Sequence, residues 1–128
     1  VMQTEPTVIS ELGDITDSLK IIQNGMHGVT SQEDHGTAYK HFVDYKYTDQ
    51  IGAKTGTAQV SRIDLENHSW FVAYAPFDDP QIAVVVFIPN GYSGANSAPA
   101  IKDIIEYYLD KAQVQCDERI YQPGVLIP

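Results

Sequence analysis

The spacing of apolar residues changes from a helical to a strand-like period near residue 50. Before that point, apolar positions recur every three or four residues, which is the spacing of one face of an α-helix. These positions are Ile15, Leu19, Ile22 and Met26. We expect this face to be buried, with Thr16 as the capping residue and Asp17 in the positive first turn of the helix.

A polar loop and a shorter amphipathic segment follow this helix. The second segment runs through Tyr39 and Phe42 and predicts a short helix. Residues 1–50 are therefore expected to be a helical segment. A brief apolar stretch at residues 8–12 suggests a strand before it.

Beyond residue 50, the pattern favours three strands at residues 51–60, 69–76 and 82–88. Polar links join neighbouring runs, so we predict an antiparallel meander over residues 51–90. The run at 82–88 is apolar on both faces, which predicts a central strand covered on both sides. The run at 51–60 carries a lysine, two threonines and two glycines, and we expect it at an exposed edge because burial would leave polar groups without partners.

The segment at residues 97–111 predicts a helix with Pro99 in its first turn. Its apolar stripe consists of Ala98, Ile101, Ile105, Tyr108 and Leu109. A stripe of this spacing packs a helix across one face of a sheet, and residues 112–128 are expected to form an extended tail. The predicted fold class is α+β, with a three-strand antiparallel sheet packed by a C-terminal helix and N-terminal helices.

Composition excludes several functions. Seventeen acidic against eight basic residues give a net charge of −9, which disfavours nucleic acid and anionic membrane surfaces as partners. Cys116 is the only cysteine, so we expect an inert thiol and no internal disulfide. No apolar run approaches the ~20 residues of a membrane span, and no signal segment is expected. The histidines lack the spacing of metal ligands, so no metal site is expected at His27, His35, His41 or His68.

The candidate chemistry lies in four consecutive residues of the first predicted strand, Lys54, Thr55, Gly56 and Thr57. A cation, two hydroxyls and a glycine make a poor core but a good wall for an anionic, peptide-like ligand. An exposed strand edge can also pair with an extended peptide. The alternative is a solvent-facing edge strand whose lysine only prevents aggregation.

Three sequence segments together resemble one known family. They are KTGTAQ at 54–59, the later NHSWFVAYAPFDDPQIAVVVFIPNG and the earlier GMHGVTSQEDHGTA. With the apolar C-terminal helix, they resemble the transpeptidase domain of penicillin-binding proteins, of the monofunctional, high-molecular-weight class B type. The resemblance covers residues 15–111 and implies that residues 1–128 are the C-terminal portion of such a domain, with a serine β-lactamase/transpeptidase-like fold.

The resemblance implies a role for each residue of the Lys-Thr-Gly-Thr strand. Lys54 would brace the proton network around a nucleophilic serine and attract the carboxylate of a substrate or β-lactam. Thr55 and Thr57 would hydrogen-bond that carboxylate, the backbone N–H of Thr57 would be an oxyanion-hole donor, and Gly56 would leave room for the acyl chain. The residues before Lys54 are Gly52 and Ala53, the reverse of the order common in the family.

The family's S-x-x-K and S-x-N motifs, the first of which carries the nucleophilic serine, do not occur in this chain. The resemblance therefore implies that the chain alone is inactive and belongs to a serine-type D,D-transpeptidase that crosslinks peptidoglycan. The implied partners are a peptidoglycan stem peptide or β-lactam and the N-terminal remainder of the domain, with no cofactor. The implied location is the extracytoplasmic face of the bacterial cell membrane.

Two other functions are compatible with a Lys-Thr-Gly strand. A non-catalytic penicillin- or peptidoglycan-binding sensor would keep the Lys-Thr-Gly strand for recognition only, and S-x-x-K and S-x-N motifs upstream in the same gene would exclude it. A serine β-lactamase shares the three motifs, but the strands between Trp70 and Phe87 match transpeptidases better in length and character.

Overall fold

The computed structural model describes residues 10–11, 13–60 and 65–115. Its elements in chain order are α1 (Thr16–His27), α2 (Tyr39–Phe42), the 3-10 helix η1 (Thr48–Gln50), β1 (Gly52–Ala58), β2 (His68–Ala75), β3 (Ile82–Ile88), the 3-10 helix η2 (Gly94–Ser97) and α3 (Ala98–Gln115). The suggested strand at 8–12 falls largely outside the described residues, and so does the predicted tail from Cys116 onward.

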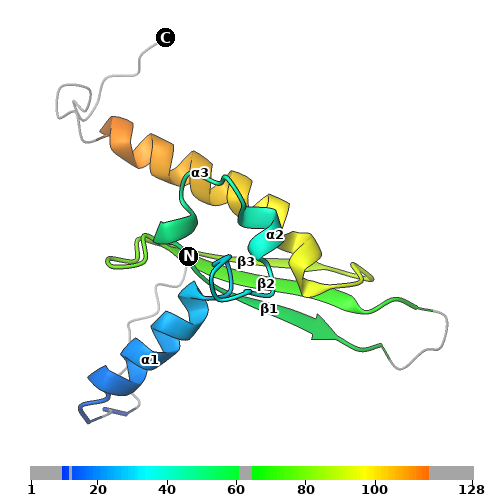
Figure 1. Ribbon diagram of the computed structural model, residues 1–128, viewed down its shortest axis with the longest axis horizontal. Helices are drawn as coiled ribbons and strands as arrows, with labels where there is room; N and C mark the ends of the chain where they lie inside the picture. The colour runs from blue at the N-terminus through cyan, green and yellow to red at the C-terminus, as the bar shows by residue number, and fades with distance from the viewer. Residues whose placement is uncertain (1–9, 12, 61–64, 116–128) are drawn as a thin grey trace, which may run out of the picture.

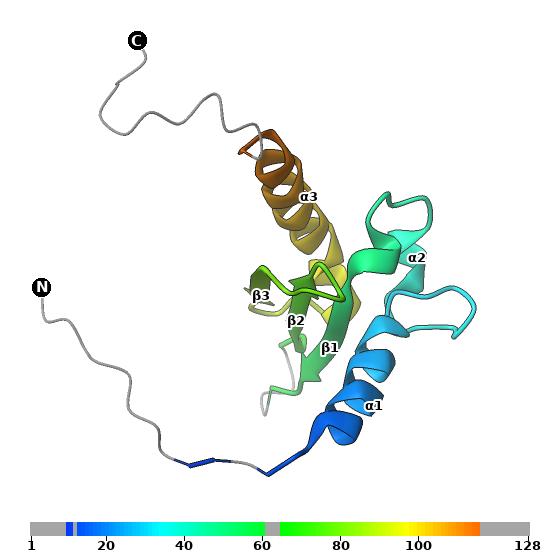
Figure 2. The ribbon, with the colours of Figure 1, turned by 90° about the vertical axis from the view of Figure 1, so that its left-hand side faces the viewer.

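The three strands form one antiparallel sheet in the order β1-β2-β3. Each strand begins and ends within about two residues of its predicted run, which confirms the predicted meander. Figure 1 shows α3 crossing one face of this sheet, with α2 on the same side, whereas α1 lies beside β1 away from α3 (Figure 2). The α+β fold is therefore as expected.

The hydrophobic core lies between α3 and the sheet. Alternate residues of β2 are fully buried on this side, among them Phe71, and the predicted stripe of α3 meets them with Ile101 and Ile105. Burial of each large aliphatic or aromatic side chain stabilises the fold by about 1.5–3 kcal/mol. Phe42 of α2 packs on Phe71 with 6.1 Å between ring centroids, so the short helix closes one end of the core.

Helix α3 is longer than predicted. It continues to Gln115, whereas the expected helix ended at residue 111 and an extended tail began at 112. Residues 112–115 contain neither glycine nor proline, so nothing in the local sequence ends the helix there. Among the described residues, no helix is both long and apolar enough to cross a lipid bilayer.

The prediction that residues 82–88 form a central, doubly covered strand is wrong. Within the described residues the central strand is β2, and β3 is the second edge of the sheet. Val85 is 63% exposed and Phe87 is 43% exposed, on the face away from α3. Short links in a meander place the middle strand in the centre whatever its composition, and the described residues supply nothing that covers this face of β3.

Helix α1 also departs from expectation. None of its residues is buried, and Ile22, at the centre of the predicted apolar face, is 57% exposed. Thr16 does not cap the helix; its backbone N–H donates instead to Asp14 Oδ1 at 3.1 Å. The helical period was therefore correct, but periodicity reports only which face is apolar and not what covers it.

Candidate active-site strand

The Lys-Thr-Gly-Thr residues lie on β1, at a free edge of the sheet. In the described part of the chain, the only strand that pairs with β1 is β2, with Gly56 opposite Trp70 and Thr57 opposite Ser69. The predicted edge position is thus confirmed. The unpaired side of an edge strand presents backbone N–H and C=O groups to any extended ligand.

Strand alternation places the lysine and the hydroxyls on opposite faces of the sheet. Thr55 and Thr57 share the α3 side with their cross-strand partners Phe71 and Ser69, both fully buried. Lys54 is exposed on the other side, and its Nζ donates to the backbone carbonyl of Thr55 at 2.6 Å. A ligand along this edge would meet the cation from one side and the hydroxyls from the other.

The Thr55 hydroxyl is held by a residue far away in sequence. Thr37 Oγ1 lies 3.0 Å from Thr55 Oγ1, and either hydroxyl can be the donor. The loop that brings Thr37 here is closed by backbone hydrogen bonds from Gly36 to Ser31 and from Ala38 to Val29. A Cβ on Gly36 would lie 2.1 Å from the carbonyl oxygen of Gly28, so only glycine fits this turn.

The Thr57 hydroxyl is held by a residue that lies 37 positions later in the sequence. Its Oγ1 accepts a hydrogen bond of 3.0 Å from the backbone N–H of Gly94 in η2. The carbonyl oxygen of Gly94 accepts from Ser69 Oγ at 3.2 Å, and Ser69 Oγ lies 2.6 Å from Ser97 Oγ. Both serines are fully buried.

Gly56 is confined on both faces of the sheet. A Cβ at this position would lie 3.2 Å from Trp70 Cβ, whereas on the other side the backbone of Gly94 packs so closely that a Cβ on Gly94 would lie 2.6 Å from Gly56 O. The backbone that approaches Gly56 on the α3 side is therefore that of η2.

An apolar patch continues from the Lys54 face of β1 across the sheet. Trp70 is 42% exposed and packs against Phe87 in a tilted arrangement with 4.3 Å between ring centroids, and Val85 lies on the same face of β3 as Phe87. We call Trp70, Val85 and Phe87 the open-face patch. Exposed apolar clusters of this kind mark surfaces that another element or molecule covers.

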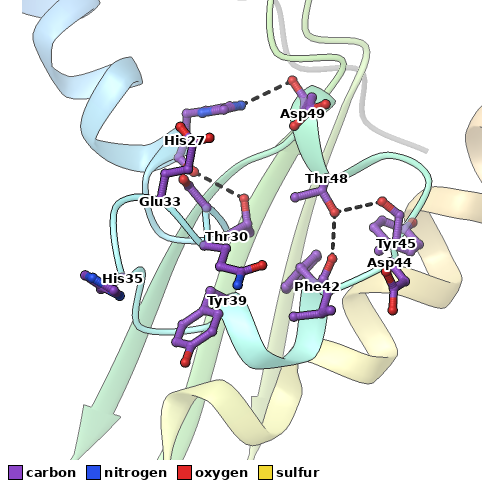
Figure 3. Close-up of a pocket in the computed structure, with 13 residues that line it drawn as sticks. His27, Thr30, Glu33, His35, Tyr39, Phe42, Asp44, Tyr45, Thr48 and Asp49 are labelled. Carbon is purple, nitrogen blue, oxygen red and sulfur yellow. Dashed lines mark hydrogen bonds between the residues drawn. The ribbon is translucent and has the colours of Figure 1, made fainter.

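A separate cavity of about 840 Å³ lies between the end of α1, α2 and η1. Figure 3 shows several of its side chains, including Glu33, Asp44 and Asp49, and none belongs to the Lys-Thr-Gly-Thr strand. His27 Nε2 is 3.3 Å from the Asp49 carbonyl oxygen, and His35 points away from the other labelled residues (Figure 3). Across residues 10–11, 13–60 and 65–115, no three His, Cys, Asp or Glu side chains come together as a metal site would require.

Sequence reasoning found the strand but missed the residues that hold its hydroxyls, namely Thr37, Ser69, Gly94 and Ser97. One signal was present for Ser69. On the core-facing side of β2 it is the single polar residue in a series otherwise formed by Phe71, Ala73 and Ala75. For the other residues the contact depends on loops whose path no local pattern predicts.

An antiparallel sheet backed by a C-terminal helix, with Lys-Thr-Gly-Thr on its free edge, is the arrangement that the resemblance implies for serine enzymes that bind penicillin. Residues 3–106 match the model of the family described as "Penicillin binding protein transpeptidase domain". The chain belongs to this family.

Known proteins of this kind are similar over most of the chain. The peptidoglycan D,D-transpeptidase MrdA of Haemophilus influenzae is 33% identical over 110 residues, which are 75% of this chain and 16% of that protein. The crystal structure of Pseudomonas aeruginosa PBP2 in complex with WCK 5153 is 39% identical, has a TM-score of 0.60 and matches 68% of this chain and 18% of that one.

A third match is the complex between PBP2 and MreC from Helicobacter pylori, with 29% identity and a TM-score of 0.63 over 77% of this chain and 18% of the PBP2 chain. This chain therefore spans less than a fifth of the length of these relatives. The relatives are bacterial, and their names place them in peptidoglycan synthesis and penicillin binding.

Proposed function

We propose that the chain is the C-terminal portion of a D,D-transpeptidase domain that crosslinks peptidoglycan and binds β-lactams. Its part in the reaction is to supply the substrate-binding strand. The observation that carries the proposal is the position of Lys54, Thr55, Gly56 and Thr57 on a free sheet edge in a chain of this family. The S-x-x-K and S-x-N motifs, absent from these 128 residues, would come from the remainder of the domain.

In the proposed reaction, a serine of the remainder attacks the carbonyl carbon of a stem peptide or β-lactam. Its oxygen loses a proton as the C–O bond forms, and the leaving nitrogen gains a proton as the C–N bond breaks. The negative charge that develops on the carbonyl oxygen is stabilised by the backbone N–H of Thr57, and such a donor contributes about 3–4 kcal/mol in the transition state. An acceptor amine from a second stem peptide then displaces the serine.

Lys54, Thr55 and Thr57 act on the anionic end of the ligand. Lys54 is exposed and carries its charge at the strand edge, where it attracts a carboxylate and supports the proton transfers of the serine. The two threonine hydroxyls on the α3 side donate to the same carboxylate. Gly56 leaves space for the acyl chain along the edge, because no side chain projects from it.

The remainder of the transpeptidase domain is the proposed partner of the open-face patch and of the free edge of β3. These surfaces are apolar or carry unpaired backbone groups, and a chain that spans less than a fifth of its relatives leaves ample sequence to cover them. The whole protein is proposed to act at the extracytoplasmic face of the bacterial cell membrane, where peptidoglycan is assembled.

The test is covalent labelling by a fluorescent penicillin. The complete protein should be labelled stoichiometrically, and Lys54→Ala should slow labelling by orders of magnitude while leaving the thermal midpoint nearly unchanged, since an exposed lysine contributes little to stability. Lys20→Ala, an exposed lysine on α1, is the matched control and should label like the wild type.

Two results would contradict this proposal. Labelling of the 128-residue chain alone would show that it carries its own nucleophile. A complete protein that binds stem peptide but takes no label would identify a recognition module without catalysis.

A further inference from the structure

Hydrogen bonds connect four residues in series, from the last residue of η2 to the Lys-Thr-Gly-Thr strand. Ser97 Oγ lies 2.6 Å from Ser69 Oγ, Ser69 Oγ donates to Gly94 O at 3.2 Å, and Gly94 N–H donates to Thr57 Oγ1 at 3.0 Å. Ser69 and Ser97 are fully buried, whereas Thr57 is exposed at the sheet edge. The series of hydrogen bonds therefore begins at two buried serines and ends at one exposed hydroxyl, that of Thr57.

The direction of each hydrogen bond follows from the number of available protons. A serine hydroxyl has a single proton. Ser69 uses its proton on the carbonyl oxygen of Gly94, so Ser97 must be the donor in the contact between the two serines. The order of donation is thus from Ser97 to Ser69 and from Ser69 to Gly94, whose N–H donates onward to Thr57.

We propose that Ser69 and Ser97 are positioning residues that hold the backbone of Gly94 through its carbonyl group, so that the N–H on the other side of its Cα donates to the Thr57 hydroxyl and leaves that hydroxyl as a donor for the carboxylate of the ligand. This inference rests on the proposed function. Because Thr57 Oγ1 accepts from the N–H of Gly94, its own proton is not used in that bond, and the exposed hydroxyl can donate it to an acceptor at the open edge. A hydrogen bond that needs no reorientation when the anion arrives costs less to form.

Close packing against β1 leaves η2 little room to move, so the N–H of Gly94 is confined near the Thr57 hydroxyl. A Cβ on Gly94 would lie 2.6 Å from Gly56 O and 2.7 Å from Gly56 N, so the two backbones already touch. Among the described side chains, Ser69 is the one that donates to the carbonyl oxygen of Gly94, which also begins the 3-10 helix η2. Loss of the Ser69 hydroxyl would leave buried Ser97 without its partner and remove the side-chain hydrogen bond to the carbonyl of Gly94.

Packing of the core does not by itself require a hydroxyl at these two buried positions. Ser69 occupies a core-facing position of β2, next to positions filled by Phe71, Ala73 and Ala75. An apolar residue of similar size would satisfy packing there. What distinguishes serine from such a residue at this position is the pair of hydrogen bonds that its hydroxyl makes.

The experiment compares Ser69→Ala with Val84→Ala in the complete protein. Val84 is a buried core residue of β3 with no part in this series of hydrogen bonds, so its variant controls for a general loss of stability. Acylation rates are measured with a penicillin and with the methyl ester of the same penicillin, which lacks the carboxylate. Thermal midpoints are measured for every variant.

We expect Ser69→Ala to slow acylation by the free acid roughly 10- to 100-fold, the range for a hydrogen bond to a charged group. Acylation by the ester should change little. Thr57→Val should show the same selectivity, and Thr57→Val combined with Ser69→Ala should be no slower than Thr57→Val alone, because both changes remove one interaction. Val84→Ala should lower the thermal midpoint without this selectivity.

The proposal is overturned if Ser69→Ala slows the acid and the ester equally, or if the effects of Ser69→Ala and Thr57→Val multiply. If Ser69→Ala proves unstable, Ser97→Ala is measured in its place and should show a smaller loss with the same preference for the acid. A wild-type protein that neither reagent acylates would instead refute the proposed function.

Discussion

At the scale of single residues, the candidate site depends on contacts between distant parts of the sequence. Thr55 is held by Thr37, eighteen residues earlier, and Thr57 by Gly94, thirty-seven residues later. Both threonine hydroxyls are therefore engaged by the protein before a ligand binds. We expect residues that never touch the ligand to influence its capture.

The first residue-scale prediction concerns Thr37. In the complete protein, Thr37→Val removes the hydroxyl partner of Thr55 and should slow penicillin acylation several-fold, because a neutral hydrogen bond is worth about 0.5–1.5 kcal/mol. Thr37→Ser keeps the hydroxyl and should retain the wild-type rate. Equal rates for the valine and serine variants would show that the contact is irrelevant to acylation.

The second residue-scale prediction concerns Gly94. Gly94→Ala would place a Cβ 2.6 Å from Gly56 O, which forces η2 away from β1. We expect a loss of about 1–3 kcal/mol in the free energy of unfolding, as for other overpacked sites, together with loss of penicillin labelling. Unfolding in urea measures the first effect, and an unchanged midpoint would contradict the observed backbone contact.

At the scale of elements, the sheet and α3 are joined by an apolar stripe that was readable from spacing alone. Ile105 is fully buried, whereas its neighbour Ile104 is 43% exposed. The two residues are chemically identical and differ only in the side of the helix they occupy. They therefore provide a direct test of how α3 packs.

Ile105→Ala should reduce the free energy of unfolding by about 2–5 kcal/mol, because it leaves a cavity in the core. Ile104→Ala should change it by no more than about 1 kcal/mol. Urea unfolding of each variant distinguishes the two. Similar losses for both variants would mean that α3 is rotated about its axis relative to the packing described.

Helix α1 offers a stabilising change. Gly25 lies within the helix, and a Cβ there would meet nothing within 4 Å. Gly25→Ala should raise the free energy of unfolding by up to about 1 kcal/mol through helix propensity. A lower thermal midpoint for this variant would show that another part of the protein packs against that position.

At the scale of the whole molecule, part of one face of the sheet is not covered by any other element in the described structure. The open-face patch of Trp70, Val85 and Phe87 is exposed on the face away from α3, and the outer edge of β3 pairs with no strand among the described residues. We propose above that the remainder of the domain covers them. The chain contains a single tryptophan, Trp70, which makes this surface observable by fluorine NMR after labelling with fluorotryptophan.

When the chain is labelled with 5-fluorotryptophan and mixed with the remainder of the domain, the fluorine resonance of Trp70 should shift as the patch becomes buried. Val85→Lys should weaken this association at least tenfold, because a charge would be buried without a partner. Gln81→Lys adds the same charge at an exposed position outside the patch and should bind normally. A resonance unchanged by the remainder would contradict the proposed partner surface.

Local pattern was sufficient for a substantial part of this protein. The period-two runs located β1, β2 and β3, the helical stripe located α3 and its buried face, and the polar content of β1 indicated an edge strand. These features are local, because the period with which side chains return to one face of a strand or helix depends only on residues a few positions apart. The Lys54–Thr57 motif was likewise visible as a contiguous segment.

The tertiary structure decided which surfaces meet. The apolar residues of β3 and α1 indicated burial, yet β3 is an edge strand and α1 has no buried residue, since the covering partner of an apolar face is not encoded in its own spacing. Only folding brings Thr37 to Thr55 and links Ser97, Ser69 and Gly94 to Thr57. Hydrogen bonds between residues 18 to 37 positions apart depend on the paths of the intervening loops, which is why the motif could be read from the chain but the residues that orient it could not.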